Sequence, residues 1–199
     1  IASMLGLFPC ALLLIPGPAF AQEQKTTVTT FTYKKVGDLE IKLDAHRAAD
    51  KKIRPLAVWI HGGALINGGR QGIGPGRQLL QAGYVVVSID YRLAGTQLLP
   101  AAVHDAARAI QFLRTKAKEW NVDPSRIAVT GGSAGAASSL WLAYHDDLAD
   151  PKSKDPVLSQ SSRVCGAIAM GGQTTLDPFL LEKEIGLAAI RHPMIWKTV

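Results

Sequence analysis

Cysteine and charged residues are scarce in this sequence. Two of its 199 residues are cysteine, which excludes a disulfide-rich scaffold and zinc sites built from paired cysteines. Charged residues make up 19% and hydrophobic residues 47%, so the composition also excludes a disordered chain. The length predicts one domain with an ample buried core.

Charge is absent from the first 22 residues. Residues 4–21 (MLGLFPCALLLIPGPAFA) contain an apolar centre, a Pro-Gly-Pro break and an Ala-Phe-Ala cleavage site, as secretory signal peptides do. We therefore predict a signal peptide at 1–21 and a secreted or periplasmic mature chain at 22–199. A membrane anchor is the alternative. The prolines leave no run of about 20 apolar residues, so we expect no stable membrane span.

The excess of positive charge, +6, is mild. In residues 25–54, eight lysines and arginines are interleaved with four aspartates and glutamates, which is typical of a solvated face. No zinc finger or aromatic-rich RNA-binding signature accompanies them, so we expect no nucleic-acid partner. Cys165 is the only cysteine of the predicted mature chain, and its apolar neighbours predict a buried structural thiol.

Strand and helix patterns alternate along the chain. Residues 26–35 and 39–43, joined by Gly37-Asp38, predict an antiparallel hairpin. Short apolar runs predict buried strands, and the segments between them have helical periodicity. The predicted strands are 56–60, 84–89, 127–130 and 164–170; the predicted helices are 77–81, 101–120, 133–144 and 179–189. This order predicts an α/β fold with a mostly parallel sheet and right-handed crossovers.

The sequence Gly131-Gly132-Ser133-Ala134-Gly135 lies between a predicted strand and a predicted helix. It matches the G-x-S-x-G turn, in which a strained serine is presented at the end of a sheet. Gly131 and Gly135 would let the strand and the helix pass closely. The helix N-terminus favours negative charge developing at the serine. Ser133 is therefore the candidate nucleophile.

A second glycine motif, His61-Gly62-Gly63-Ala64, directly follows the strand 56–60. Successive glycines let backbone N–H groups turn toward a ligand. Beside the serine turn, this loop would supply an oxyanion hole from Gly62 and Gly63, completed by the N–H of Ala134. An ordinary strand-to-loop turn is the alternative for this motif, and a phosphate-binding turn of a nucleotide fold is the alternative for the serine motif. No Gly-x-Gly-x-x-Gly or Gly-Lys-Ser/Thr pattern follows any predicted strand, which disfavours nucleotide binding.

These two motifs, together with Asp90-Tyr91-Arg92-Leu93, Pro100-Ala101 with Asp105, and Asp123-Pro124-Ser125-Arg126-Ile127, resemble the α/β-hydrolase esterases and lipases of the hormone-sensitive-lipase-like branch. The fourth position of the first motif is often Gly in that branch, so Ala64 is a mild departure. The resemblance implies a serine esterase that forms an acyl-enzyme and needs no metal or organic cofactor. Similar secreted enzymes cleave small or polysaccharide-linked esters, and related folds carry peptidases that cut after proline.

Other polar residues receive structural interpretations. The resemblance puts the catalytic histidine last in the chain, so His61 is expected to shape the oxyanion loop through hydrogen bonds. Asp90 precedes the serine and is interpreted as a structural acceptor, and Asp105 as a helix-surface or packing residue. The glycine-rich segment 67–76 is either a mobile lip over the site or a plain loop.

The triad acid and base are harder to find. After Ser133 the only histidines are His145, too far along its own helix, and His192. The order Ser133, Asp177, His192 is formally possible, although Asp177 has the pattern of a helix N-cap. No strand pattern follows residue 170, and the chain starts at Ile1. We therefore expect a partial α/β-hydrolase domain at 22–199 whose acid and base lie beyond Val199. A non-catalytic hydrolase-like binding protein is the remaining alternative.

Overall fold

A six-stranded mixed sheet forms the centre of the computed structural model, which describes residues 25–95, 99–175 and 177–186. The strand order is β1-β2-β4-β3-β5-β6. Strands β3 to β6 run parallel, and β1 and β2 add an antiparallel hairpin beside β4. The strands are β1 (Thr26–Val36), β2 (Leu39–Ala48), β3 (Arg54–Ile60), β4 (Val85–Ile89), β5 (Val122–Gly132) and β6 (Gly166–Met170).

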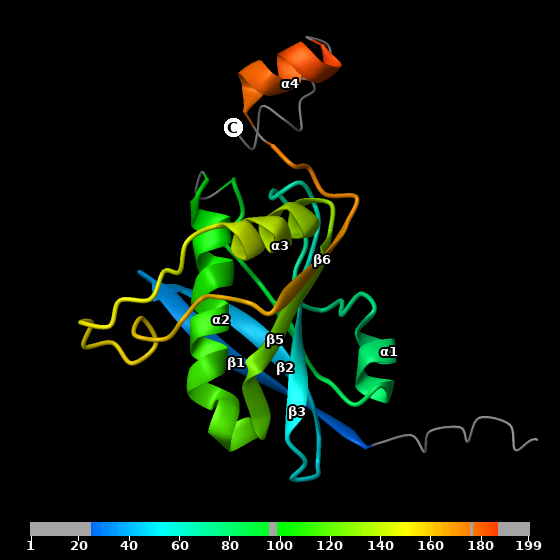
Figure 1. The fold of residues 1–199 in the computed structure, drawn as a ribbon, viewed down its shortest axis with the longest axis vertical. Helices are drawn as coiled ribbons and strands as arrows, with labels where there is room; N and C mark the ends of the chain where they lie inside the picture. Colours follow the sequence, from blue (N-terminus) through cyan, green and yellow to red (C-terminus); the bar gives the residue numbers. More distant parts are fainter. Residues whose placement is uncertain (1–24, 96–98, 176, 187–199) are drawn as a thin grey trace, which may run out of the picture.

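Helices cover the two faces of this sheet. Helix α1 (Gly76–Gln81) packs on β3 and β4, on the opposite side from α2 (Ala101–Trp120), as Figure 1 shows. Helix α3 (Ala134–Tyr144) lies beside α2 and contacts β5 and β6. Helix α4 (Pro178–Ile185) stands apart from the sheet (Figure 1). No helix among the described residues is long and apolar enough to cross a membrane.

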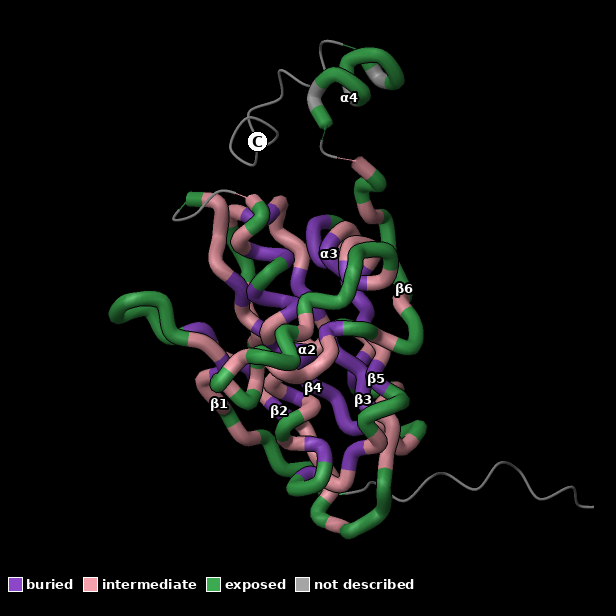
Figure 2. Tube along the Cα trace, turned by 60° about the vertical axis from the view of Figure 1, so that its left-hand side comes forward, coloured by how far each residue is buried: buried purple, intermediate pink, exposed green. Residues whose placement is uncertain are grey.

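The core lies between the central strands and α2. Side chains of β3, β4 and β5 that were predicted to be covered on both faces are almost fully buried, among them Val58, Val87 and Val129. Figure 2 shows this burial concentrated in the middle of the sheet. The predicted α/β-hydrolase architecture, with its mostly parallel sheet and N-terminal hairpin, is confirmed. The predicted signal peptide and the histidine at 192 lie outside the described residues.

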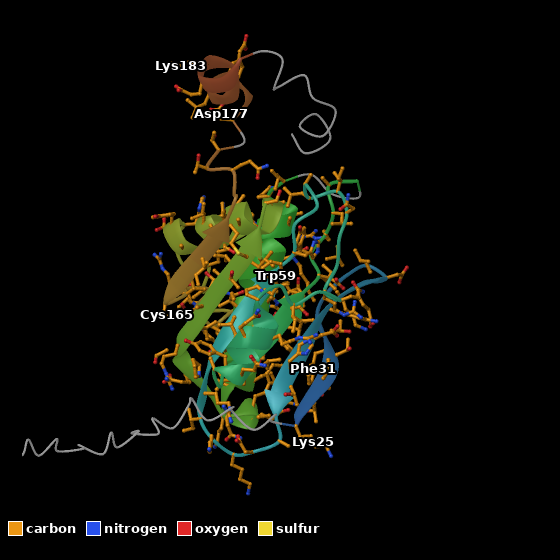
Figure 3. All side chains as sticks on the ribbon, turned by 90° about the vertical axis from the view of Figure 1, so that its right-hand side faces the viewer. Lys25, Phe31, Trp59, Cys165, Asp177 and Lys183 are labelled. Carbon is orange, nitrogen blue, oxygen red and sulfur yellow. The ribbon has the colours of Figure 1, made fainter. Side chains whose placement is uncertain are left out.

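One prediction about burial is wrong. Cys165 is exposed, not buried. It precedes β6, which forms the end of the sheet in the described part of the chain, and most β6 side chains are exposed as well. Figure 3 shows Cys165 on the outside of the ribbon at this edge. An apolar run indicates a strand but does not reveal whether a neighbouring element covers it.

Candidate active site

Ser133 occupies a sharp turn between β5 and α3. Its backbone angles are φ 53° and ψ −119°, a combination that residues with a Cβ rarely adopt. The side chain is exposed and makes no capping hydrogen bond to the helix that it precedes. The turn thus presents a hydroxyl at the carboxyl end of the parallel strands, where ligands bind in open α/β sheets.

The glycines flanking Ser133 are required by close backbone contacts. A Cβ on Gly135 would overlap the carbonyl oxygen of Ile60 on β3, and a Cβ on Gly131 would overlap the backbone of Gly135. Strand β5 and helix α3 therefore approach each other and β3 more closely than any side chain allows. This confirms the packing role predicted for Gly131 and Gly135.

The loop after β3 lies directly against the serine turn. A Cβ on Gly62 would be 2.7 Å from the carbonyl oxygen of Gly132 and 3.4 Å from the Cβ of Ser133. The next three residues all have positive φ: 105° at Gly63, 52° at Ala64 and 61° at Leu65. The two motifs, more than 65 residues apart in the sequence, thus meet at one point.

Backbone N–H groups are available at this meeting point. Within the described part of the chain, the N–H groups of Gly62, Gly63 and Ala134 donate to no backbone carbonyl. The N–H of Ala64 likewise donates to no backbone carbonyl of the described residues. The carbonyl of Gly63 accepts hydrogen bonds from the N–H groups of Ile66 at 2.9 Å and Asn67 at 3.1 Å. In the sequence, Ala64 stood out only as a mild departure from the Gly that is frequent at this position. Its position in the run of N–H groups was the available signal for a donor.

The His61 side chain supports this loop rather than Ser133. Its Nδ1 lies 2.6 Å from the carbonyl oxygen of Gly62, and since a carbonyl only accepts, Nδ1 donates. The ring stacks on Tyr91, with centroids 4.2 Å apart. Burial is the largest influence on His61 and lowers its pKa, which keeps the imidazole neutral at pH 7. The geometry agrees with the predicted loop-shaping role.

The glycine-rich segment 67–76 is tied to the sheet. The backbone N–H and the guanidinium of Arg70 donate to the Asp90 carboxylate at 2.8 and 2.7 Å. The guanidinium also donates to Asp44 at 3.0 Å, and Ser88 Oγ donates to the Arg70 carbonyl at 2.6 Å. These contacts favour the plain-loop interpretation over the mobile lip. They also show that Asp90 is a structural acceptor, as predicted.

Asp105 is a packing residue and not a surface one, although it lies on α2. It is fully buried, and its carboxylate accepts from the Arg92 guanidinium at 2.8 Å and from Lys34 Nζ at 2.5 Å. Burial alone would raise the pKa of Asp105, but the hydrogen bonds from Arg92 and Lys34 outweigh it and leave the pKa lowered. This ion cluster holds the segment after β4 against α2.

The described residues bring no acid or base to Ser133. His145 ends α3, its ring stacks on Trp141 at 4.1 Å, and eleven helical residues separate it from the serine turn. Asp177 caps α4 by accepting from the N–H groups of Phe179 and Leu180, as predicted. In Figure 3, Asp177 lies with α4, away from the sheet. No cluster of three or more potential metal-ligating side chains occurs among the described residues.

A mainly apolar cavity of about 340 Å³ begins beside the turn and follows one face of α3. Its lining includes Ala134 and Ala137 of α3 and Leu65 of the oxyanion loop. Polar groups lie at Gln173, Thr174 and Thr175. The cavity therefore connects a candidate oxyanion donor to a space suited to an apolar group.

The arrangement of strand, serine turn and glycine loop belongs to a known protein family. Residues 39–183, almost three quarters of the chain and including both motifs, match the model of the family described as BD-FAE. The chain belongs to the BD-FAE family. The match ends before His192 and starts after the predicted signal peptide, so the BD-FAE segment is the part that carries the serine turn and the glycine loop.

Several known proteins similar to this BD-FAE chain are named esterases or hydrolases. Carboxylesterase NlhH of Mycobacterium tuberculosis is 40% identical over 91 residues, which are 45% of this chain and 28% of NlhH. The acetyl ester-xyloside bifunctional hydrolase of Caldicellulosiruptor lactoaceticus superposes with a TM-score of 0.68 and 25% identity, over 76% of this chain and 59% of that one.

Propionate-bound esterase 2 of Thermogutta terrifontis superposes with a TM-score of 0.65 and 28% identity, over 81% of this chain and 59% of that one. The matches thus span less than two thirds of each of these three proteins.

Proposed function

We propose that the protein is a serine carboxylesterase with Ser133 as its nucleophile. The observation that carries the proposal is the contact between the strained Ser133 turn and the glycine loop at Gly62 and Gly63. The esterase names of several similar proteins support it. The uncharged segment 1–21 supports a secreted or periplasmic location.

In this mechanism, Ser133 Oγ attacks the ester carbonyl as a general base takes its proton. The carbonyl oxygen becomes an oxyanion and accepts hydrogen bonds from the N–H groups of Gly62, Gly63 and Ala134. Each such donor is worth about 2.7–4 kcal/mol of barrier. The tetrahedral intermediate expels the alcohol, which takes up the proton, and water then releases the acid from the acyl-enzyme.

The nucleophile is tested by turnover of nitrophenyl acetate and butyrate by the full-length protein. Ser133→Ala should lower kcat by about 10³-fold or more. Ser139→Ala is the control variant. Ser139 is a buried serine on α3, the helix that Ser133 precedes, and its hydroxyl donates only to the Gly135 carbonyl, at 2.8 Å. It should retain kcat within about twofold. Undiminished turnover by Ser133→Ala, or cleavage of proline peptides without esters, would contradict the assignment.

The cavity along α3 supports a substrate whose apolar group packs beside Ala134. Because a similar protein is named an acetyl ester-xyloside hydrolase, we include sugar-linked esters among the candidate substrates. Ala137→Leu narrows the cavity, whereas Ala143→Leu adds the same volume on the same helix outside its lining. Only Ala137→Leu should shift the chain-length profile, lowering kcat/KM about tenfold for the longer esters and sparing acetate. Equal profiles would show that the cavity takes no part in substrate binding.

A further inference from the structure

We propose that Tyr91 is a positioning residue that fixes the direction of the oxyanion-loop N–H groups. The proposal rests on the esterase function proposed above. Tyr91 follows β4 and is 4% exposed. Its hydroxyl donates to the carbonyl oxygen of His61 at 2.9 Å and approaches that of Gly62 at 3.4 Å.

These two carbonyls belong to the peptide groups whose N–H ends are the proposed donors. The His61 carbonyl shares a planar peptide with the Gly62 N–H, and the Gly62 carbonyl shares one with the Gly63 N–H. In a trans peptide the C=O and N–H bonds point in opposite directions. A hydrogen bond that holds the carbonyl on the Tyr91 side therefore holds the N–H on the other side.

Such restraint is needed because two consecutive glycines leave the peptide groups free to rotate. Gly63 has a φ of 105°, a conformation that residues with a Cβ rarely adopt. The Gly62 carbonyl receives a second restraint from His61 Nδ1 at 2.6 Å, and the Tyr91 ring stacks on the same imidazole at an interplanar angle of 12°. The hydroxyl thus acts on both peptide groups, and the ring supports the imidazole that restrains the second of them.

Tyr91 is itself held rigidly by its neighbours in sequence. Asp90 accepts from Arg70 at 2.7 Å, and the backbone N–H and guanidinium of Arg92 donate to buried Asp105 at 3.0 and 2.8 Å. Burial also raises the pKa of Tyr91, so its hydroxyl keeps the proton that it donates across the range of pH in which esterases are assayed.

The chain offers a matched control for a merely structural tyrosine. Tyr33 on β1 is 3% exposed, and its hydroxyl donates to a backbone carbonyl, that of Asp90, at 2.6 Å. Tyr33→Phe and Tyr91→Phe therefore delete the same group from equally buried sites. Tyr33 bonds to the carbonyl one residue before Tyr91, whereas only Tyr91 bonds to the oxyanion loop itself.

The experiment measures kcat and KM for nitrophenyl acetate with the full-length protein. The rate is divided by the concentration of active serines, determined by active-site titration, so that unfolded molecules do not contribute. Tyr91→Phe should lower kcat about tenfold, less than complete loss of a donor, with KM within about twofold. Affinity for a short trifluoromethyl ketone, which forms a tetrahedral oxyanion adduct, should fall by the same factor. Tyr33→Phe should keep kcat and ketone affinity within about twofold.

The proposal is overturned if the two variants lose kcat equally, if Tyr91→Phe changes only KM, or if Tyr91→Phe fails to fold while Tyr33→Phe folds. The last result would show that the Tyr91 hydroxyl stabilises the fold as a whole and does not specifically position the loop. Failure of the esterase function itself has a different signature, because wild-type protein would then not turn over the ester or Ser133→Ala would retain the wild-type rate.

Discussion

Ser133→Gly should stabilise the protein while abolishing its activity. At φ 53° and ψ −119°, the Cβ of Ser133 costs about 1–3 kcal/mol of strain, which glycine does not pay. Glycine gives back about 0.4–1 kcal/mol through the greater freedom of the unfolded chain. The exposed side chain makes no capping bond that would be lost, and the backbone bond from the Ser133 N–H to Met170 at 3.0 Å remains.

The net gain is therefore about 1 kcal/mol, or about 2–4 °C in Tm for a domain of this size. Urea unfolding and thermal melts of wild type, Ser133→Gly and Ser133→Ala measure it. Ser133→Ala keeps the Cβ and should stay close to wild type. Ala134→Gly, one residue further into α3, is the control, because there glycine relieves no strain and should cost up to about 1 kcal/mol.

The strain argument is refuted if Ser133→Gly is destabilised as much as Ala134→Gly, or if Ser133→Ala gains as much stability as Ser133→Gly. In the first case the turn stores no strain. In the second, the gain comes from loss of the hydroxyl and not from the backbone. A confirmed gain would show that the conformation of Ser133 is maintained at a cost in stability, as expected of a residue placed for chemistry.

Three further outcomes follow from the packing. Gly135→Ala should lower the free energy of unfolding by about 3 kcal/mol, because its Cβ overlaps backbone, whereas Gly132→Ala, with its nearest atom 3.8 Å away, should change it by less than about 0.5 kcal/mol in urea titrations. Asp105→Asn should lower the free energy of unfolding by about 3 kcal/mol at pH 7. Since the pKa of Asp105 is lowered by folding, its contribution is present above the unfolded pKa of about 3.9 and is lost as pH falls further, so the difference between variant and wild type should shrink in acid melts. Cys165 should react with a thiol reagent in the native protein about as fast as in urea, and strong protection would contradict its exposure.

The parallel strands and the serine turn were predictable because local rules determine them. Runs such as residues 56–60 are apolar on both faces only where helices cover both sides of a sheet. Gly131 and Gly135 are visible in the sequence because the backbone passes too close for any Cβ. Residue type therefore reports the geometry directly at these positions.

The surroundings of Asp105 and Cys165 were not predictable because they depend on distant segments. Asp105 is neutralised by Lys34, 71 positions away in the sequence, as well as by Arg92. Helical periodicity alone leaves such a carboxylate on either the surface or the packed side. Cys165 sits beside a strand whose apolar pattern is the same whether or not a further element covers it.

The role proposed for Tyr91 could not be predicted from the sequence for a different reason. Its hydroxyl acts on carbonyl groups, which every residue possesses, so the partner positions carry no signature of the contact. The glycines at 62 and 63 reveal that the loop needs backbone freedom, but not what removes that freedom once the chain has folded. A flexible loop that must present fixed donors requires an anchor from elsewhere in the fold. Here the segment after β4 supplies it, and the comparison of Tyr91→Phe with Tyr33→Phe separates that anchoring from ordinary burial.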